Sequence, residues 1–120
     1  MATLSQRFIQ SLADLSFEDL TDSACKAVKE RCIDYLGSLA GGVHEGTLAQ
    51  VLLADIKARQ CFSGASSVIG TPYRTDAAQA ALLNGVTGHS LELDDGHRKA
   101  YGHPAVVVFS ALFPLAEMLK

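Results

Sequence analysis

Residues 76–93 read DAAQAALLNGVTGHSLEL, and this stretch is the clearest sign of a helical fold. It is rich in alanine and leucine, two of the strongest helix formers, and either Thr75 or Asp76 can cap its start. Its apolar residues recur at helical spacing, and four are expected on the buried face: Ala78, Leu82, Val86 and Leu93. Gly85 and Gly88 lie inside it, where each costs about 1 kcal/mol relative to alanine. These small residues allow another backbone or a ligand to approach closely.

Two upstream segments show the same helical periodicity. A short first helix is expected after Thr3, which can act as its N-cap, with an apolar stripe of Leu4, Phe8, Leu12 and Leu15. A second helix is expected to begin near Thr21 or Asp22 and to end at Gly41-Gly42. Its expected inward-facing residues are Cys25, Val28, Cys32, Leu36 and Leu39.

A third helix is predicted from about Thr47 to Arg59, and its expected inward-facing residues are Leu48, Val51, Leu52 and Ile56. Residues 61–75, CFSGASSVIGTPYRT, are rich in glycine, serine and threonine and predict a loop with at most a brief extended segment. The last segment, from Pro104, could open with a buried strand, but the absence of a strand partner favours a helix that Pro114 kinks or restarts. The prediction is a single all-α domain over residues 1–120, with about five helices and one long Gly/Ser-rich loop.

Composition narrows the class of protein. A chain of 120 residues that is 48% hydrophobic fits one packed domain, and its ten scattered Lys and Arg residues form no stripe that would bind nucleic acid. No apolar run approaches the ~20 residues of a membrane helix. The three cysteines lack C-x-x-C spacing, which favours core positions over a disulfide or a zinc site. The acidic N-terminus has no apolar signal core, so a cytoplasmic location is expected.

Residues 89–103 concentrate the groups that can carry chemistry: His89, Glu92, Asp94, Asp95, His97 and His103. His89 and Glu92 are i,i+3 neighbours, so their side chains can meet. His103 directly precedes Pro104 and is the expected N-cap of the last helix. The positive end of a helix favours a neutral imidazole, which is the form that a general base needs, and it attracts an anion such as a carboxylate.

Other interpretations of the same residues remain open. His89 could be a hydrogen-bonded core histidine, and Asp94 and Asp95 could simply end a helix. His97 lies in what looks like a solvated loop with Arg98 and Lys99, and His44 is expected on the surface. A metal site could use His89, Asp94, His97 and His103, although they do not follow an established spacing such as H-E-x-x-H.

The stretch from Asn84 to Glu117, NGVTGHSLELDDGHRKAYGHPAVVVFSALFPLAE, resembles the most recognisable block of the MmgE/PrpD family. That block reads N-G, then H-x-x-D-x-D-D, then a short loop and H-P, then an apolar helix ending in A-E. The segments YLGSLAGG and SSVIGTPYRTDAAQAALLNG resemble the family upstream, so the likeness covers nearly the whole chain. One position departs from the pattern, because Glu92 stands where the family usually has aspartate.

The resemblance implies a lyase of the 2-methylcitrate dehydratase or cis-aconitate decarboxylase type. Such enzymes dehydrate, decarboxylate or epimerise small polycarboxylates without a metal or organic cofactor, and they form homodimers. Family members are several times longer, with a split helical domain and an α/β lid, so the chain is expected to be an N-terminal fragment that is inactive alone.

The same resemblance assigns roles to residues of the 89–103 segment. His103 is the expected proton-transfer group, with Asp94 and Glu92 as orienting or relay carboxylates. His89, Asp95 and Arg98 are candidate substrate contacts, and Asp95 is also a candidate for holding the loop. The alternatives are a metal-dependent hydrolase or lyase and a non-catalytic helical binding domain.

Overall fold

The computed structural model describes residues 1–120. Its helices are α1 (Leu4–Ala13), α2 (Asp22–Glu45), α3 (Thr47–Arg59), α4 (Ala77–His89) and α5 (Pro104–Met118), with a short 3-10 helix η1 (Phe17–Asp19). Two-residue strands β1 (Ser66–Ser67) and β2 (Arg74–Thr75) form an antiparallel pair, with Ser66 opposite Thr75. The prediction of a mainly helical fold with five α-helices is confirmed, and the bounds of α3 are those expected from the sequence.

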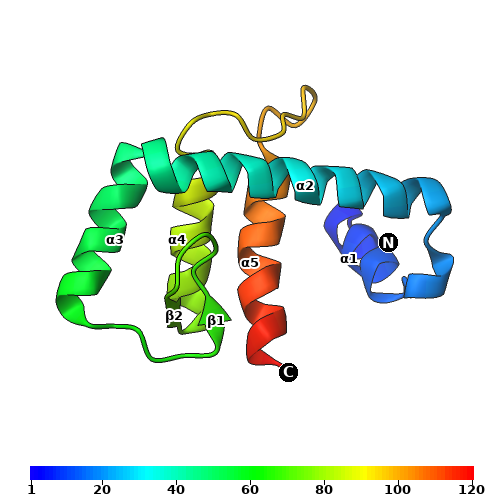
Figure 1. Ribbon diagram of the computed structural model, residues 1–120. Helices are drawn as coiled ribbons and strands as arrows, with labels where there is room; N and C mark the ends of the chain where they lie inside the picture. Colours follow the sequence, from blue (N-terminus) through cyan, green and yellow to red (C-terminus); the bar gives the residue numbers. More distant parts are fainter.

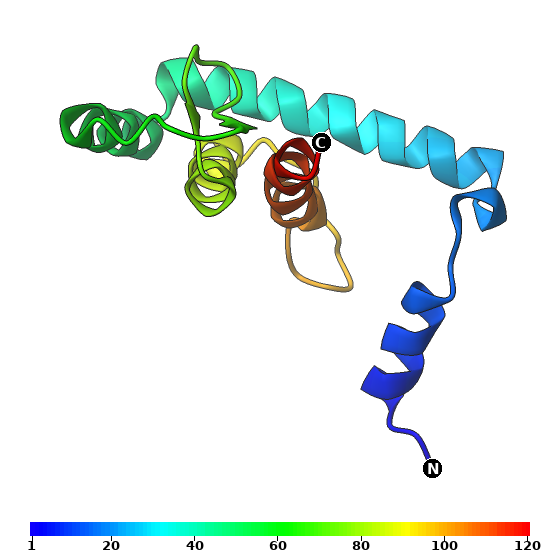
Figure 2. The ribbon, with the colours of Figure 1, turned by 90° about the horizontal axis from the view of Figure 1, so that it is seen from below.

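The long helix α2 spans the molecule, and α3, α4 and α5 extend from it on one side (Figure 1). Viewed from below, α4 and α5 lie next to each other beneath the C-terminal half of α2 (Figure 2). The β1–β2 hairpin covers α4 and the end of α5. In contrast, α1 packs against no other helix or strand, although its capping box between Thr3 and Gln6 is complete.

Two groups of buried side chains form the core. One joins α2 to α5 through Tyr35, Leu39, Ala105 and Val106, and the other joins α3, the hairpin and α4 through Leu53, Ile56, Val68 and Leu83. Cys25, Cys32 and Cys61 are free thiols, and each is only partly buried, so none reaches the core position expected from the sequence.

The predicted end of the second helix is wrong. Helix α2 continues through Gly41 and Gly42 to Glu45. Gly42 is buried where α2 crosses α4, and a Cβ there would collide with the carbonyl oxygen of Thr87. The glycine pair therefore permits a close helix crossing and does not end the helix.

The predicted inward faces of three helices also need correction. On α4, Ala78 and Leu82 are exposed and Val86 is half-buried, and Leu93 lies exposed beyond the end of the helix at His89, whereas the buried face carries Ala80, Leu83, Asn84, Thr87 and Gly88. On α3, Leu48 and Val51 are exposed, and Ala49 and Leu53 are buried with Ile56. Both helices have apolar residues around most of their circumference, so periodicity alone could not select the packed side. On α2, Val28 and Leu36 are likewise exposed.

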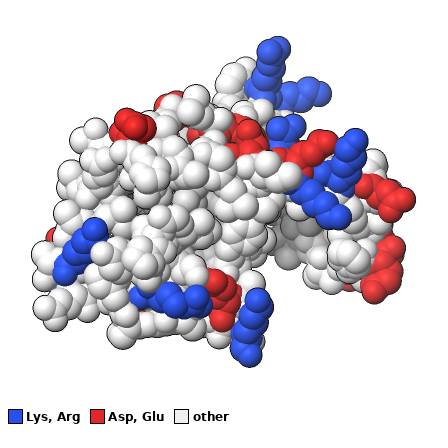
Figure 3. Space-filling view, in the orientation of Figure 1, with Lys and Arg blue, Asp and Glu red and all other residues white.

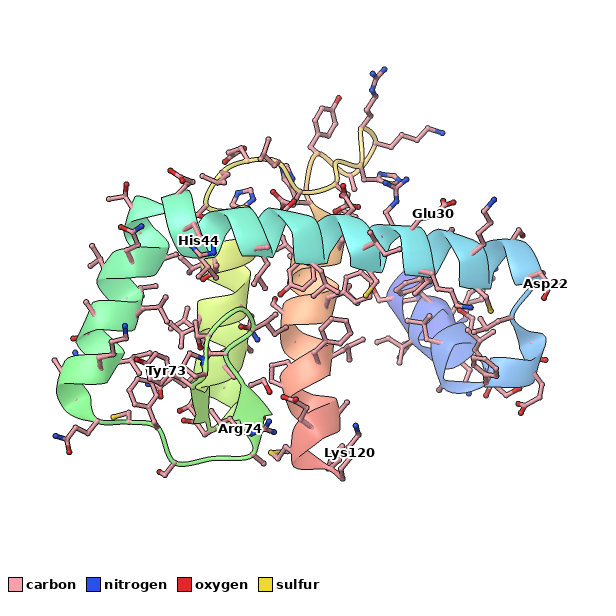
Figure 4. The ribbon with its side chains drawn as sticks, viewed as in Figure 1. Asp22, Glu30, His44, Tyr73, Arg74 and Lys120 are labelled. Carbon is pink, nitrogen blue, oxygen red and sulfur yellow. The ribbon has the colours of Figure 1, made fainter.

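Helix α5 is continuous from Pro104 to Met118, so Pro114 does not restart it. The carbonyl oxygen of Pro114 accepts a hydrogen bond from the hydroxyl of Ser66 at 2.7 Å. Glu117, one turn later, accepts hydrogen bonds from the backbone N–H of Ser67 at 2.5 Å and from its hydroxyl at 2.8 Å. Arg74 lies on the hairpin beside this end of α5 (Figure 4), with its guanidinium 3.7 Å from the Glu117 carboxylate.

Charged side chains are unevenly distributed over the face seen in Figure 3. Lys, Arg, Asp and Glu gather toward the N-terminal half of the chain, the loop above α2 and the lower edge, and much of the surface over α3, α4 and α5 is uncharged. None of the helices combines the length and the apolar character that crossing a membrane requires.

Candidate active site

A buried carboxylate lies at the centre of the site. The Asp94 side chain is 0% exposed and lies in the connection between α4 and α5. The Nδ1 atom of His89 lies 3.1 Å from each carboxylate oxygen of Asp94. The Nδ1 atom of His103 lies 3.3 Å from Asp94 Oδ2 and 3.3 Å from the Asp94 backbone oxygen. One aspartate therefore holds two histidines that are fourteen positions apart in the sequence.

Local structure explains how these three residues meet. Helix α4 ends at His89, and the following turn brings Asp94 back beneath it. Asp95 accepts a hydrogen bond from the backbone N–H of Ala105 at 3.0 Å, which satisfies a free donor in the first turn of α5. His103 occupies the N-cap position, as expected, but its side chain makes no capping hydrogen bond. Asp95 provides the capping hydrogen bond instead, so the His103 imidazole is free to contact Asp94.

The geometry fixes which nitrogen atoms remain available. The two imidazole rings meet edge to face, with centroids 4.8 Å apart and planes at 65°. If the ionised Asp94 carboxylate accepts from both Nδ1–H groups, the lone pair of each neutral ring is on Nε2. Nε2 of His103 has no hydrogen-bond partner in the protein, whereas Nε2 of His89 lies 3.2 Å from Glu92 Oε1.

The predicted contact between His89 and Glu92 is therefore confirmed, but Glu92 differs from Asp94 in its surroundings. Its side chain is 73% exposed, and its backbone has a φ of +54°. Aspartate adopts this left-handed conformation more readily than glutamate. The longer residue thus occupies a backbone position that suits the aspartate of the family pattern.

Two cavities meet at His103. One, of about 460 Å³, lies between α4 and α5 and is called here the α4–α5 groove; it is lined by Leu48, Gly85, Val86, His89, Ser90, His103, Val106, Val107 and Ser110. The other, of about 570 Å³, lies under the loop before α5 and is lined by Gly96, His97, Arg98, Tyr101, Gly102 and His103. Of the groove residues other than histidine, Gly85 was expected from the sequence to allow close approach, and the rest were not identified as site residues because they have no distinctive chemistry.

Several predicted residues lie apart from this centre. Arg98, a candidate substrate contact, is exposed in the loop and forms no ion pair. The groups that contact the Asp94 carboxylate are the two histidines, and no Lys or Arg is among them. His97 is exposed, and its Nδ1 accepts the backbone N–H of Ala100 at 3.0 Å. His44 is exposed near the end of α2 (Figure 4), as expected.

Asn84, the first residue of the N-G pair, holds the scaffold together. Its side chain accepts from the backbone N–H of Ile69 at 2.9 Å and donates to the carbonyl of Ser67 at 3.0 Å. It is buried between the hairpin and α4. The asparagine fixes the hairpin against the helix that carries His89, so its contribution to the site is structural.

His89, Asp94 and His103 could also hold a metal ion. One donor atom from each residue lies within 4.8 Å of the others, and two imidazoles with a carboxylate are ligand types suited to zinc or another divalent transition metal. In the structure Asp94 lies within 3.1–3.3 Å of both histidine nitrogens, so it is the hydrogen-bond partner of each. His97, the fourth candidate metal ligand from the sequence, does not belong to this group.

Comparison with known proteins identifies the family. The model of the MmgE/PrpD N-terminal domain matches residues 6–120. The chain belongs to the MmgE/PrpD family. Human cis-aconitate decarboxylase is 31% identical over 122 residues, and the mouse cis-aconitate decarboxylase is 28% identical over 120 residues. Each alignment covers 99% of this chain and 24% of the relative.

The chain thus spans about a quarter of the length of these MmgE/PrpD relatives. No solved structure gives a significant match. The family and the names of its relatives point to lyases that act on small molecules.

Proposed function

We propose that this chain supplies the proton-transfer half of a lyase site that acts on small polycarboxylates. The observation that supports the proposal most strongly is the buried Asp94 carboxylate bound to Nδ1 of His103, at the meeting point of two cavities. A carboxylate in this position orients an imidazole and selects its tautomer, as in other acid–base sites. The site needs neither a metal ion nor an organic cofactor for this role.

The proposed step uses Nε2 of His103 as the base. Nε2 takes a proton from the carbon next to a substrate carboxylate, and the electron pair of the C–H bond remains on the substrate. In a dehydration that pair forms the double bond, and the hydroxide that leaves takes a proton from the imidazolium formed on His103 to become water. In a decarboxylation no C–H proton is removed: the C–C bond breaks, carbon dioxide leaves, the electron pair stays on the carbon, and His103 starts as the imidazolium and donates its proton there. An epimerisation would return the proton to the opposite face.

His89 and Glu92 extend the same network. Both nitrogens of His89 face carboxylate oxygens, Nδ1 at 3.1 Å from Asp94 and Nε2 at 3.2 Å from Glu92, so both are already engaged within the protein. We therefore assign His89 to positioning Asp94 and to contacting substrate, with Glu92 as the outer carboxylate. Asp95 supports the loop from its place at the start of α5.

Polycarboxylate chemistry also requires cations, because negative charge develops on the substrate in the transition state. Arg98 is the cation that lines the cavity beside His103, and we propose that it contacts a substrate carboxylate. The single positive charge of Arg98 does not balance the two or three negative charges of a polycarboxylate substrate. The 120-residue chain alone should therefore have no measurable turnover, as a fragment of a larger cytoplasmic, homodimeric enzyme.

The test compares His97 and His103, two histidines six positions apart in the connection before α5. With the chain joined to the remaining domains of a cis-aconitate decarboxylase, His103→Ala should lower kcat by about 10²–10⁴-fold, and His97→Ala should have little effect. The wild-type chain alone, assayed with cis-aconitate or 2-methylcitrate, should be inactive. Equal losses from both substitutions would contradict the assignment to His103, and turnover by the isolated chain would contradict the need for further cations.

The grouping of His89, Asp94 and His103 supports a second candidate, a metal-dependent hydrolase or lyase. Elemental analysis of purified protein distinguishes the two. One equivalent of bound metal, lost on Asp94→Asn and needed for activity, would favour the metal site over direct proton transfer. A third candidate, a binding domain without catalysis, predicts no turnover even in the joined enzyme.

A further inference from the structure

Gly88 is buried where α2, α4 and α5 meet, directly before the histidine that ends α4. A Cβ at this position would lie 2.7 Å from Cε2 of Tyr35 on α2 and 3.2 Å from Cγ2 of Val106 on α5. Both distances are shorter than the separation of about 3.5–4.0 Å that two carbon atoms in contact prefer. Only a residue without a side chain lets the last turn of α4 approach both neighbouring helices this closely.

Neither neighbour has room to move aside. Tyr35 is 0% exposed, and its ring packs against Phe109 and Phe113. Its hydroxyl donates to the carbonyl oxygen of Asn84 at 3.4 Å, so both ends of the tyrosine side chain are held. Val106 is buried in the same core group. Because a packed core responds to an added methyl group by shifting its backbone, a Cβ on the glycine would displace the end of α4.

The two helix ends that Gly88 brings together carry the histidines of the candidate site. His89 follows Gly88 directly, and His103 lies three residues before Val106 at the start of α5. The two imidazole centroids are 4.8 Å apart. Nδ1 of His103 lies 3.3 Å from Asp94 Oδ2, already at the long end of N–H···O distances. An outward shift of about 0.5 Å would therefore take this pair out of hydrogen-bonding range.

We propose that Gly88 is a positioning residue, whose missing side chain keeps α4 and α5 close enough for Asp94 to hold His103 in the tautomer that leaves Nε2 free. The inference rests on the proposed function, because His103 is the proposed base. Gly88 acts through the spacing of the two histidines on one carboxylate. A side chain there would loosen the contact with Asp94 and leave the His103 imidazole free to adopt the other tautomer.

Nitrogen-15 NMR of the imidazoles at alkaline pH tests this role with two matched substitutions on α4. Gly88→Ala adds a methyl group at the contact of the three helices, and a substantial fraction of His103 should change from the Nδ1-protonated to the Nε2-protonated form. Gly85→Ala adds the same group three residues earlier. A Cβ there would meet only Ser110, at 3.3 Å from a hydroxyl oxygen that can rotate. His103 should keep its wild-type form in this variant.

Two further variants separate positioning from stability. Leu53→Ala opens a cavity in the other core group, so it should destabilise the fold without changing the His103 tautomer. Tyr35→Leu removes the ring carbon that a Cβ at Gly88 would meet. The double variant Gly88→Ala with Tyr35→Leu should therefore recover the Nδ1-protonated form of His103, and it provides the test if Gly88→Ala alone does not fold.

A kinetic measurement uses the chain joined to the remaining domains of a cis-aconitate decarboxylase. Gly88→Ala should lower kcat by about tenfold or more and change KM by less than about threefold, because misplacing a reacting group by about 1 Å can cost about 10²-fold. Leu53→Ala should keep kcat within about threefold of the wild-type value. A kcat that is unchanged in Gly88→Ala, or reduced equally in both variants, would contradict the inference.

Three NMR results would also overturn it: an unchanged His103 tautomer in folded Gly88→Ala, the same tautomer change in Leu53→Ala, and no recovery in the double variant. Failure of the proposed function would appear differently, as an unaltered kcat in His103→Ala while the tautomers behave as expected.

Discussion

The helices at the two ends of this chain differ in packing, and α1, which has the clearest apolar stripe, is the one that remains uncovered. In the C-terminal part, α4 and α5 pack on each other and on the second half of α2, and Tyr35 and Leu83 are almost completely buried. In the N-terminal part, α1 has no buried residue and Phe8 remains 62% exposed. The difference shows that helical periodicity identifies an apolar face without identifying what covers that face.

The largest contrast is expected between two aromatic residues. Tyr35 is 0% exposed, and its ring packs against Phe109 and Phe113 with centroids 5.7 Å and 6.2 Å away. Burial, with a smaller effect of Cys32, raises the pKa of its hydroxyl well above the ordinary value. Tyr35→Ala should lower the free energy of unfolding by about 3–5 kcal/mol, while Phe8→Ala should change it by less than about 0.5 kcal/mol.

Urea denaturation of both variants measures this contrast. If Tyr35→Ala and Phe8→Ala lower the free energy of unfolding by similar amounts, α1 must pack against the other helices in solution. The proposed difference in packing between the two ends of the chain would then be wrong.

A smaller contrast is expected between two glycines of α2. A Cβ at Gly42 would collide with the Thr87 carbonyl oxygen, whereas a Cβ at Gly37 would meet nothing within 4 Å. Gly42→Ala should destabilise the fold by about 1–3 kcal/mol through overpacking, and Gly37→Ala should stabilise it by up to about 1 kcal/mol through helix propensity. Thermal unfolding should therefore shift in opposite directions. A shift of the same sign in both would contradict the close crossing of α2 and α4.

The smallest effect concerns Glu117 and depends on pH. The hydrogen bond from the backbone N–H of Ser67, helped by the Ser67 hydroxyl and Arg74, lowers the pKa of Glu117 below its ordinary value of 4.5. Because the folded pKa is the lower one, the carboxylate stabilises the fold above pH 4.5, and this contribution is lost as the pH falls through the folded pKa. Glu117→Gln should cost about 1 kcal/mol at pH 7 and flatten the acid side of the stability curve.

The control for Glu117 comes from the less packed end of α2. Glu30 forms an exposed pair with Lys26 at 3.9 Å, and Glu30→Gln should change the unfolding free energy by less than about 0.5 kcal/mol. An acid transition that is unchanged in Glu117→Gln would show that the hairpin is not held to α5 by this carboxylate.

Sequence reasoning succeeded where local chemistry determines the structure. Thr3, Thr21 and Asp76 cap helices because their side chains accept backbone N–H groups three residues ahead, and this pattern is visible in the sequence. The contact between His89 and Glu92 follows in the same way from their spacing.

The parts that could not be predicted depend on distant contacts. Gly42 was predicted to end the helix because its contact with Thr87 is not visible in the sequence, and the hydrogen-bond partners of Asn84, Ile69 and Ser67, lie 15 and 17 positions away in the hairpin. The contact of Asp94 with both His89 and His103 could not be predicted either, because the loop that brings His103 to Asp94 has no regular periodicity. The interpretation of His103 as N-cap was correct in position, but Asp95 provides the capping hydrogen bond.

The tautomer of His103 tests the central claim, that Asp94 holds Nδ1 and leaves Nε2 free for proton transfer. Nitrogen-15 NMR of the imidazoles at alkaline pH should show His103 protonated on Nδ1. His97, whose Nδ1 accepts the Ala100 N–H, should show the opposite form, protonated on Nε2. Asp94→Asn should disturb the His103 signals and spare those of His97. A His103 ring protonated on Nε2 in the wild-type protein would contradict the account, because the nitrogen proposed as the base would then have no lone pair to accept a proton.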